Sequence, residues 1–237
     1  MSSVLTLRLA GPLQAWGASA RFARRTTEPA PTKSGVIGLL AAALGRQRSD
    51  DVSDLAALRF GVRVDQRGVP VRDYQTAHHF ETGRSMPVSE RFYLADAVFV
   101  AAVEGDDDLI RRLDRALQNP VYLPYLGRRS CPPSQRIELG VHAATSIEER
   151  LNAEGWQAAP WHQRRHREPT VRLETLVQED GHVDTLRDQP LSFDPRHRRY
   201  ALRGVRHGHV DIPNPAARDA RTGIPPAHDP TAVLRGQ

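Results

Sequence analysis

Residues 32–45, TKSGVIGLLAAALG, give the clearest indication of the fold, because they predict a buried helix. Ser34 is a candidate N-cap and Gly45 a candidate stop, so we expect a helix over this stretch. A helix on a protein surface has one apolar stripe, whereas this one is apolar almost all round. We therefore expect the helix to be buried against a β-sheet.

The segments on either side of this helix predict the strands of that sheet. The expected elements are a strand at 4–9, two strands within 58–77 around the turn Gln66-Arg67-Gly68, a strand at 92–103, an amphipathic helix at 107–119 and a strand at 136–144. If one interruption in the chain is left out, the order of these elements matches the βαββαβ pattern of ferredoxin-like domains. RNA-recognition (RRM-like) domains share this pattern. We predict an α+β fold with a ferredoxin-like domain over residues 1–144.

The interruption is residues 75–91, QTAHHFETGRSMPVSER. It is polar and separates two strand-like runs, so we expect an inserted hairpin that projects from the sheet. The alternative is a disordered loop. Further on, residues 145–212 predict a small β-containing region, and the proline-rich residues 213–237 predict a mobile tail.

The charge of the chain favours a polyanionic partner. The formal net charge is +5, from 33 basic against 28 acidic residues, and Lys33 is the single lysine. Arginine is suited to bidentate phosphate contacts and to stacking on bases. The sequence has no GxGxxG or GxxxxGK[ST] phosphate loop and no HExxH or GxSxG motif. The basic balance therefore favours a polyanionic partner, and none of these catalytic or phosphate-loop motifs is present.

Other features limit the classes of site and location. Cys131 is the single cysteine, which excludes an internal disulfide and a CxxC zinc or redox pair. His207 and His209 form an HxH motif without spaced acidic partners or cysteines, which is a weak zinc signal, and His78 with His79 makes a second short pair. We expect no metal or other cofactor. The N-terminus does not match a secretory leader, and no apolar run approaches the roughly 20 residues of a membrane span. We expect a cytoplasmic protein without membrane contact.

Residues 124–134, PYLGRRSCPPS, are the strongest candidate for a binding loop. The prolines prevent a helix, Gly127 permits a positive φ, and the adjacent Arg128 and Arg129 suit a phosphate. The alternative is an ordinary solvated turn. Cys131 is expected to be a small buried packing residue.

Charges and aromatic rings in other loops extend this candidate site. Arg21, Arg24 and Arg25 follow the first strand, and Lys33 and Ser34 begin the buried helix, where free N–H groups favour an anion. Trp16 and Tyr74 offer faces on which unpaired bases stack. Packing beneath the loop is an equal alternative for Trp16.

Five stretches carry a resemblance to a known family: LRLAGPLQAWG, PTKSGVIGLLAAALG, RDYQTAH, RFYLADA and PYLGRRSCPPS. In this order they resemble the CasD family of subunits of Cascade, the type I-E CRISPR surveillance complex. The resemblance implies a non-catalytic subunit that binds the 5′ handle of CRISPR RNA and caps the complex in antiviral defence. It also implies that the hairpin inserted at about 75–91 is a thumb. Contact with the backbone subunit CasC and the large subunit CasA, with target DNA nearby, is implied as well.

The charge argument and the resemblance together give the expected RNA-binding residues. They are Gln14, Trp16, Arg25, Lys33, Ser34, Tyr74, His78, Arg84, Tyr125, Arg128, Arg129 and Ser130. The alternative function is a metal-independent endoribonuclease that processes CRISPR precursor RNA, because relatives in another subtype cut RNA themselves. In that case Lys33, Tyr74 and His78 are the candidates for the cation and base that such cleavage needs.

Overall fold

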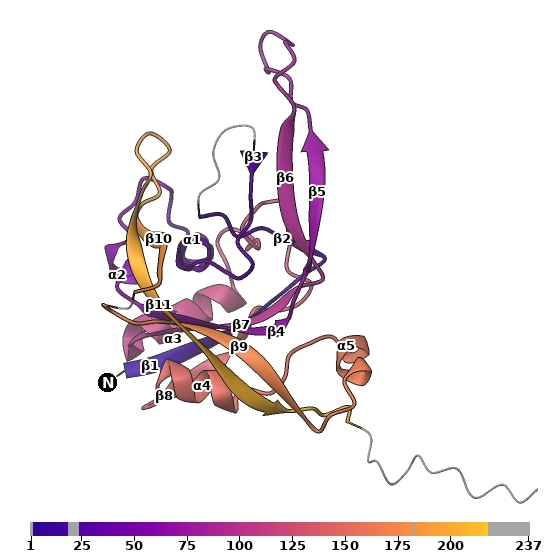
Figure 1. Cartoon of the computed structure of the whole chain (residues 1–237). Coiled ribbons are helices and arrows are strands. Elements are labelled where there is room, and N and C mark those ends of the chain that lie inside the picture. The colour runs from indigo at the N-terminus through magenta and orange to yellow at the C-terminus, as the bar shows by residue number, and fades with distance from the viewer. Residues whose placement is uncertain (1, 19–23, 182, 218–237) are drawn as a thin grey trace, which may run out of the picture.

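The computed structural model describes residues 2–18, 24–181 and 183–217. In this part of the chain the fold is mixed α/β, with more strands than helices. A seven-stranded sheet has the order β10-β11-β9-β4-β7-β1-β8, and all neighbouring strands in it are antiparallel (Figure 1). Its strands are β1 (Ser2–Ala10), β4 (Arg59–Gln66), β7 (Val98–Asp106), β8 (Glu138–Ala143), β9 (Thr170–Gln178), β10 (Thr185–Ser192) and β11 (Arg199–Pro213).

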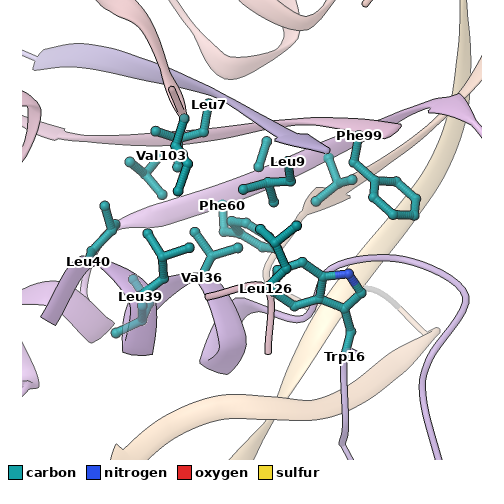
Figure 2. Close-up of a cluster of buried hydrophobic side chains, with 14 of the residues drawn as sticks. Leu7, Leu9, Trp16, Val36, Leu39, Leu40, Phe60, Phe99, Val103 and Leu126 are labelled. Atoms are coloured by element: carbon teal, nitrogen blue, oxygen red, sulfur yellow. The ribbon is translucent and has the colours of Figure 1, made fainter. Parts of the chain in front are cut away.

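Helices α1 (Lys33–Ala43) and α3 (Asp107–Gln118) cover one face of this sheet. Side chains alternate along a strand, so Leu5, Leu7 and Leu9 of β1 all point into the core beneath these helices (Figure 2). A fully buried leucine stabilises the fold by about 1.5–3 kcal/mol. The expected burial of α1 against a sheet is confirmed.

The N-cap of α1 differs from the prediction. The backbone of Thr32 is extended and its hydroxyl accepts a hydrogen bond from the N–H of Gly35 (3.3 Å). Ser34 already lies inside the first turn, so its backbone is helical and it does not cap. The prediction was therefore two residues late.

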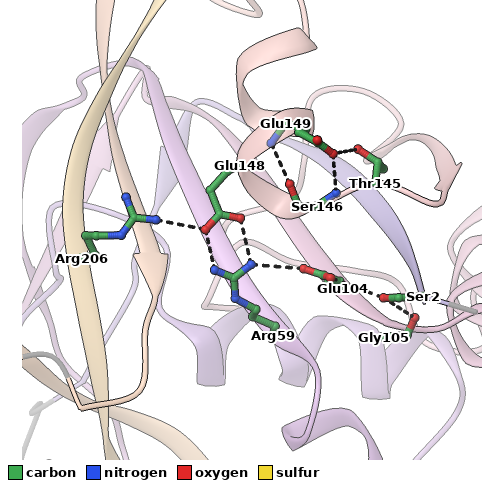
Figure 3. Close-up of polar contacts among 9 residues, drawn as sticks. All are labelled: Ser2, Arg59, Glu104, Gly105, Thr145, Ser146, Glu148, Glu149 and Arg206. Atoms are coloured by element: carbon green, nitrogen blue, oxygen red, sulfur yellow. Dashed lines mark hydrogen bonds and ion pairs between the residues drawn. The ribbon is translucent and has the colours of Figure 1, made fainter.

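Helix α4 (Ile147–Ala153) covers the other face, against Val4 and Val100. An ionic network fastens it there (Figure 3). Glu148 accepts hydrogen bonds from Arg59 of β4 (2.5 and 2.9 Å) and from Arg206 of β11 (3.0 Å). These groups are partly exposed, so each pair contributes about 0.2–1 kcal/mol. The network holds one helix against two strands that are far apart in the sequence.

The residues expected to form a small C-terminal β-containing region continue the same sheet. β9 pairs with β4, and β11 and β10 follow outward from β9. The start of the expected tail is packed, because Asn214 is buried and its amide donates to the carbonyl of His166 (2.9 Å). Residues 218–237 of that expected tail lie outside the described residues.

A long hairpin of β5 (Val69–Gln75) and β6 (Ser89–Ala95) leaves the sheet (Figure 1). We call residues 69–95 the arm. β2 (Leu13–Gln14) pairs with β6 at the base of the arm, and β3 (Arg24–Arg25) pairs with β6 further out, at Glu90 and Arg91. The expected projection at 75–91 is thus the outer part of a longer hairpin.

The single strand expected at 92–103 is wrong, because β6 and β7 are separate strands in different sheets. The chain turns between them at Asp96, which has a φ of 54°. The side-chain amide of Gln66 donates to the carbonyl of Asp96 (2.6 Å), which joins the two chain segments that connect the sheet to the arm.

Two short helices, α2 (Ser53–Ala56) and α5 (Pro160–Arg165), were not predicted. Among the described helices, none has the length and apolar character needed to cross a lipid bilayer.

Candidate nucleic-acid interface

An open groove of about 1370 Å³ lies over α1. Small residues of the helix, Gly35, Gly38 and Ala42, line its floor. Its walls are the segment 121–132, the base of the arm with β3, and the turn between β10 and β11. Because α1 exposes little side chain here, a ligand can lie close to the helix backbone.

The groove is strongly basic. Its lining contains Arg25, Arg46, Arg48, Arg91, Arg128, Arg129 and Arg198, and no aspartate or glutamate. Arg46 makes two 2.5 Å hydrogen bonds to Asp54, which neutralises it. The other six have no carboxylate within 4.0 Å among the residues that the structure describes. Such a concave, one-sign surface attracts a polyanion.

The loop at 124–133 is fixed against the end of β2. The N–H of Ala15 donates to the carbonyl of Leu126 (3.1 Å), and the N–H of Leu126 donates to the carbonyl of Cys131 (2.8 Å). Gly127 has a φ of 83°, and a Cβ atom there would overlap the carbonyl oxygen of Ala15. Cys131 is fully buried, and burial raises the pKa of its thiol, which confirms its expected packing role.

The two arginines of this loop have different surroundings. The guanidinium of Arg128 donates to the carbonyl of Arg25 (2.8 Å) and lies 4.7 Å from the ring centroid of Tyr93. Arg129 and the neighbouring Ser130 are exposed on the groove wall. Arg128 therefore ties the loop to β3 and the base of the arm, while Arg129 is free to contact a ligand.

Seven of the predicted RNA-binding residues line this groove. They are Trp16, Arg25, Ser34, Tyr125, Arg128, Arg129 and Ser130. Arg21, from the same charge argument, lies outside the described residues. The fold thus brings together predicted charges from two separate segments, Arg25 from one and Arg128 with Arg129 from the other.

Gln14 and Trp16 are buried, so neither side chain offers the expected RNA contact. Gln14 donates to the carbonyls of Leu9 (3.1 Å) and Ala97 (2.8 Å) and accepts from the indole N–H of Trp16 (3.0 Å). The ring of Trp16 is 1% exposed and lies in the core cluster with Leu126 (Figure 2). Stacking of a base on Trp16 was the wrong alternative, and packing beneath the loop is the correct one.

Lys33 is also buried, and the expected anion site beside it is already filled. Its backbone N–H donates to the carboxylate of Asp188 (2.7 Å), which also receives two 2.8 Å hydrogen bonds from Arg203. Its ammonium donates to Gln178 (2.9 Å), and burial lowers the pKa of Lys33 to about 8. A protein carboxylate therefore takes the place at the start of α1 that the sequence suggested for phosphate.

The remaining predicted residues lie on the arm and not in the groove. Tyr74 is 55% exposed, with the guanidinium of Arg72 5.0 Å from its ring centroid. His78 pairs with Ser85 near the tip, and Arg84 is exposed beside it. Since Lys33 is buried at the start of α1, it does not share a surface with Tyr74 and His78.

Sequence reasoning missed several groove residues. They are Arg46, Arg48, Arg91, Tyr122, Phe193, Arg198 and Tyr200. The run RHRRY at 196–200 was a usable signal, because it combines basic and aromatic residues in a few positions. That run reaches the groove through long-range contacts, namely the strand order β10-β11-β9-β4 and the bond from the start of α1 to Asp188 of β10.

The family model described as CRISPR-associated protein (Cas_Cas5) matches residues 4–206. This chain belongs to the Cas5 family. The Cas5 match ends within β11, so it includes the groove wall at the β10–β11 turn.

Curated proteins and solved structures include several that are similar to this chain. The Escherichia coli (strain K12) protein "CRISPR system Cascade subunit CasD" is 42% identical over 172 residues, which cover 64% of this chain and 76% of that protein. A structure titled "Crystal structure of Cas protein" is 38% identical, with a TM-score of 0.69, and covers 92% of this chain and 98% of its own. A chain from "CRISPR RNA-guided surveillance complex" is 32% identical, with a TM-score of 0.74, and covers 91% and 93%.

Proposed function

We propose that this chain is a non-catalytic subunit of a Cascade-type CRISPR surveillance complex and that its groove binds the 5′ handle of CRISPR RNA. The observation that carries the proposal is a groove lined by seven arginines and no carboxylate. The names of the relatives support it, since one is a Cascade subunit and another belongs to an RNA-guided surveillance complex.

The groove has the two kinds of group that single-stranded RNA requires. Arg25, Arg91 and Arg129 lie at its wall and supply planar donors for phosphate oxygens. Tyr122 is 48% exposed and lines the same groove, so its ring is available to an unpaired base. The fixed loop at 124–133 keeps Arg129 in place, and the bond from Arg128 to the carbonyl of Arg25 ties β3 to that loop, which lowers the entropy lost on binding.

The finer form of the fold belongs to the same proposal. The strands β8-β1-β7-β4, with α1 and α3 on one face, form a ferredoxin-like core, and the arm is inserted between its second and third strands as a thumb. The arm exposes apolar side chains, among them Phe80, Met86 and Val88. These cover a neighbouring subunit, CasC, while CasA and target DNA lie close by in a cytoplasmic complex.

The endoribonuclease alternative is less well supported. It needs a cation and a base on the same scissile phosphate. The candidate cation, Lys33, is buried and bonded to Gln178, whereas Tyr74 and His78 are exposed on the arm. No described contact joins them. We therefore expect purified protein to leave repeat RNA intact in EDTA on a denaturing gel.

Handle binding and complex assembly test the proposal directly. The variant Arg25→Ala/Arg129→Ala removes two unpaired groove charges and is expected to weaken binding of a synthetic handle RNA and to lower its salt slope by about 1.4, at about 0.7 per phosphate. Arg111→Ala/Arg136→Ala is the matched control, since it also removes two charges and both side chains are exposed (55% and 84%) and lie outside the groove. Equal binding and assembly by both variants would contradict the assignment.

A further inference from the structure

The segment 161–167, WHQRRHR, forms a second basic surface. It comprises most of α5 and the residues that follow, and it carries Arg164, Arg165 and Arg167. Residues 155–167 contain no acid, and Glu168 is the first one after them. In Figure 1, α5 lies beyond the ends of β9 and β11, away from α1 and β3. No residue between 133 and 192 lines the groove, so the two surfaces are separate.

Helix α5 is held in place by hydrogen bonds, although none of its side chains is part of a hydrophobic core. None of its residues is buried, and six residues are too few to form a stable helix alone. At its start, the N–H of Ala159 donates to the side chain of Gln66 (3.0 Å). At its end, the amide of the buried Asn214 donates to the carbonyls of Gln163 (3.3 Å) and His166 (2.9 Å). The fold thus holds an exposed basic helix rigidly at its surface.

The preceding tryptophan completes this support. The indole N–H of Trp156 donates to the carbonyl of Asp65 (2.8 Å), and its ring lies edge-on to His162 (5.9 Å) and His166 (5.3 Å). Trp156 is 6% exposed, so it anchors the segment and contacts no ligand.

The exposed groups of the segment are an aromatic ring and unpaired guanidinium groups. Trp161 is 45% exposed, with the guanidinium of Arg165 5.9 Å from its ring centroid. Within the described chain, Arg164, Arg165 and Arg167 make no ion pair. An exposed indole beside unpaired arginines is the combination with which proteins bind single strands without reading their sequence.

We infer that the surface of Trp161, Arg164, Arg165 and Arg167 is a second nucleic-acid site, which binds a single-stranded segment. The arginines contact consecutive phosphates and an unpaired base stacks on Trp161. The site is independent of the handle-binding groove. An acidic protein would use the arginines but would gain little from the indole face, so a nucleic acid fits the whole surface better.

Intrinsic fluorescence gives a site-specific test on the full chain. The sequence has three tryptophans, and Trp16 and Trp156 are buried at 1% and 6% exposure, so a stacking base quenches mainly Trp161. Oligo-deoxythymidylate and oligo-uridylate of about 12 nucleotides are the probes, and their comparison separates DNA from RNA. We expect saturable quenching that Trp161→Phe abolishes.

Charge variants separate this site from the groove. Arg164→Ala/Arg165→Ala/Arg167→Ala is expected to weaken the quenching titration at least tenfold and to lower its salt slope by about 2. Arg111→Ala/Arg112→Ala/Arg115→Ala removes the same charge from the exposed side of α3 and is expected to change little. Arg25→Ala/Arg129→Ala is expected to leave the quenching unchanged, even if handle binding fails. Three results would overturn the inference: no quenching, equal affinity of the two triple variants for the oligonucleotides, or displacement of the bound oligonucleotide by polyglutamate as effectively as by a nucleic acid.

Discussion

The backbone N–H of Lys33 donates to the carboxylate of Asp188, 155 residues further along the chain (2.7 Å). Asp188 lies on β10 and is itself paired with Arg203 of β11. The start of α1 is therefore stabilised by strands of the C-terminal region, through the helix dipole and a buried ion pair. This contact fixes the floor of the groove relative to the β10–β11 wall.

Asp188→Asn is expected to lower the free energy of unfolding by about 3 kcal/mol, because it leaves the buried charge of Arg203 without a partner. Urea unfolding measures this as a lower midpoint at unchanged m. Asp211→Asn, at an exposed position of β11, is the control and is expected to shift the midpoint little. Equal midpoints for the two variants would show that the pair contributes nothing.

Gly127→Ala is expected to destabilise the binding loop, because the added Cβ overlaps the carbonyl oxygen of Ala15. Gly83→Ala is the matched control: it also has a positive φ, 65°, but nothing lies within 4 Å of the added Cβ. Both variants carry the backbone strain of about 1 kcal/mol, and only the first adds the overlap. Unfolding curves and handle affinity measured for both isolate the steric effect, and a Gly127→Ala protein no worse than Gly83→Ala would refute it.

Arg198→Glu is expected to weaken handle RNA binding more than tenfold, since a carboxylate would enter a groove that has none. Arg198 is exposed at the β10–β11 turn, so the fold should be unaffected. Filter binding at several salt concentrations measures the change, with Arg136→Glu as the control outside the groove. Unchanged affinity for Arg198→Glu would mean that this wall does not touch the RNA.

Local sequence patterns predicted the parts of the site that depend on nearby residues. The prolines and Gly127 indicated an irregular loop, and the loop does present Arg129 to the groove. Trp16 could not be placed in the same way, because an indole near a loop suits both packing and stacking. Its burial depends on Leu126, which is distant in the sequence.

The errors at Lys33 and Arg198 have a common cause. A helix N-terminus predicts an anion but not which one, and here the anion is supplied by Asp188 of β10. Arg198 is next to the same pair of strands and enters the groove for the same reason. Both depend on the long-range strand order β10-β11-β9-β4, which no short pattern encodes.

The buried ammonium of Lys33 makes stability depend on pH. Burial, with the nearby charge of Arg203, lowers the pKa of Lys33 from 10.5 to about 8 in the folded protein. Between these two values the unfolded chain binds more protons at this group than the folded chain does. The free energy of unfolding therefore rises with pH across this window, by up to about 3 kcal/mol from Lys33.

Lys33→Met removes this titration and keeps a long apolar stem at the position. Urea unfolding of both proteins at pH 7 and pH 10 gives the difference in free energy of unfolding between wild type and variant at each pH. The contributions of the other titrating groups cancel in this difference. We expect the wild type to gain on the variant as the pH rises, because its lysine becomes neutral without leaving the core. A difference that is constant, or that falls with pH, would mean that the ammonium is well compensated by Gln178 and Asp188 and that its charge is not a source of instability.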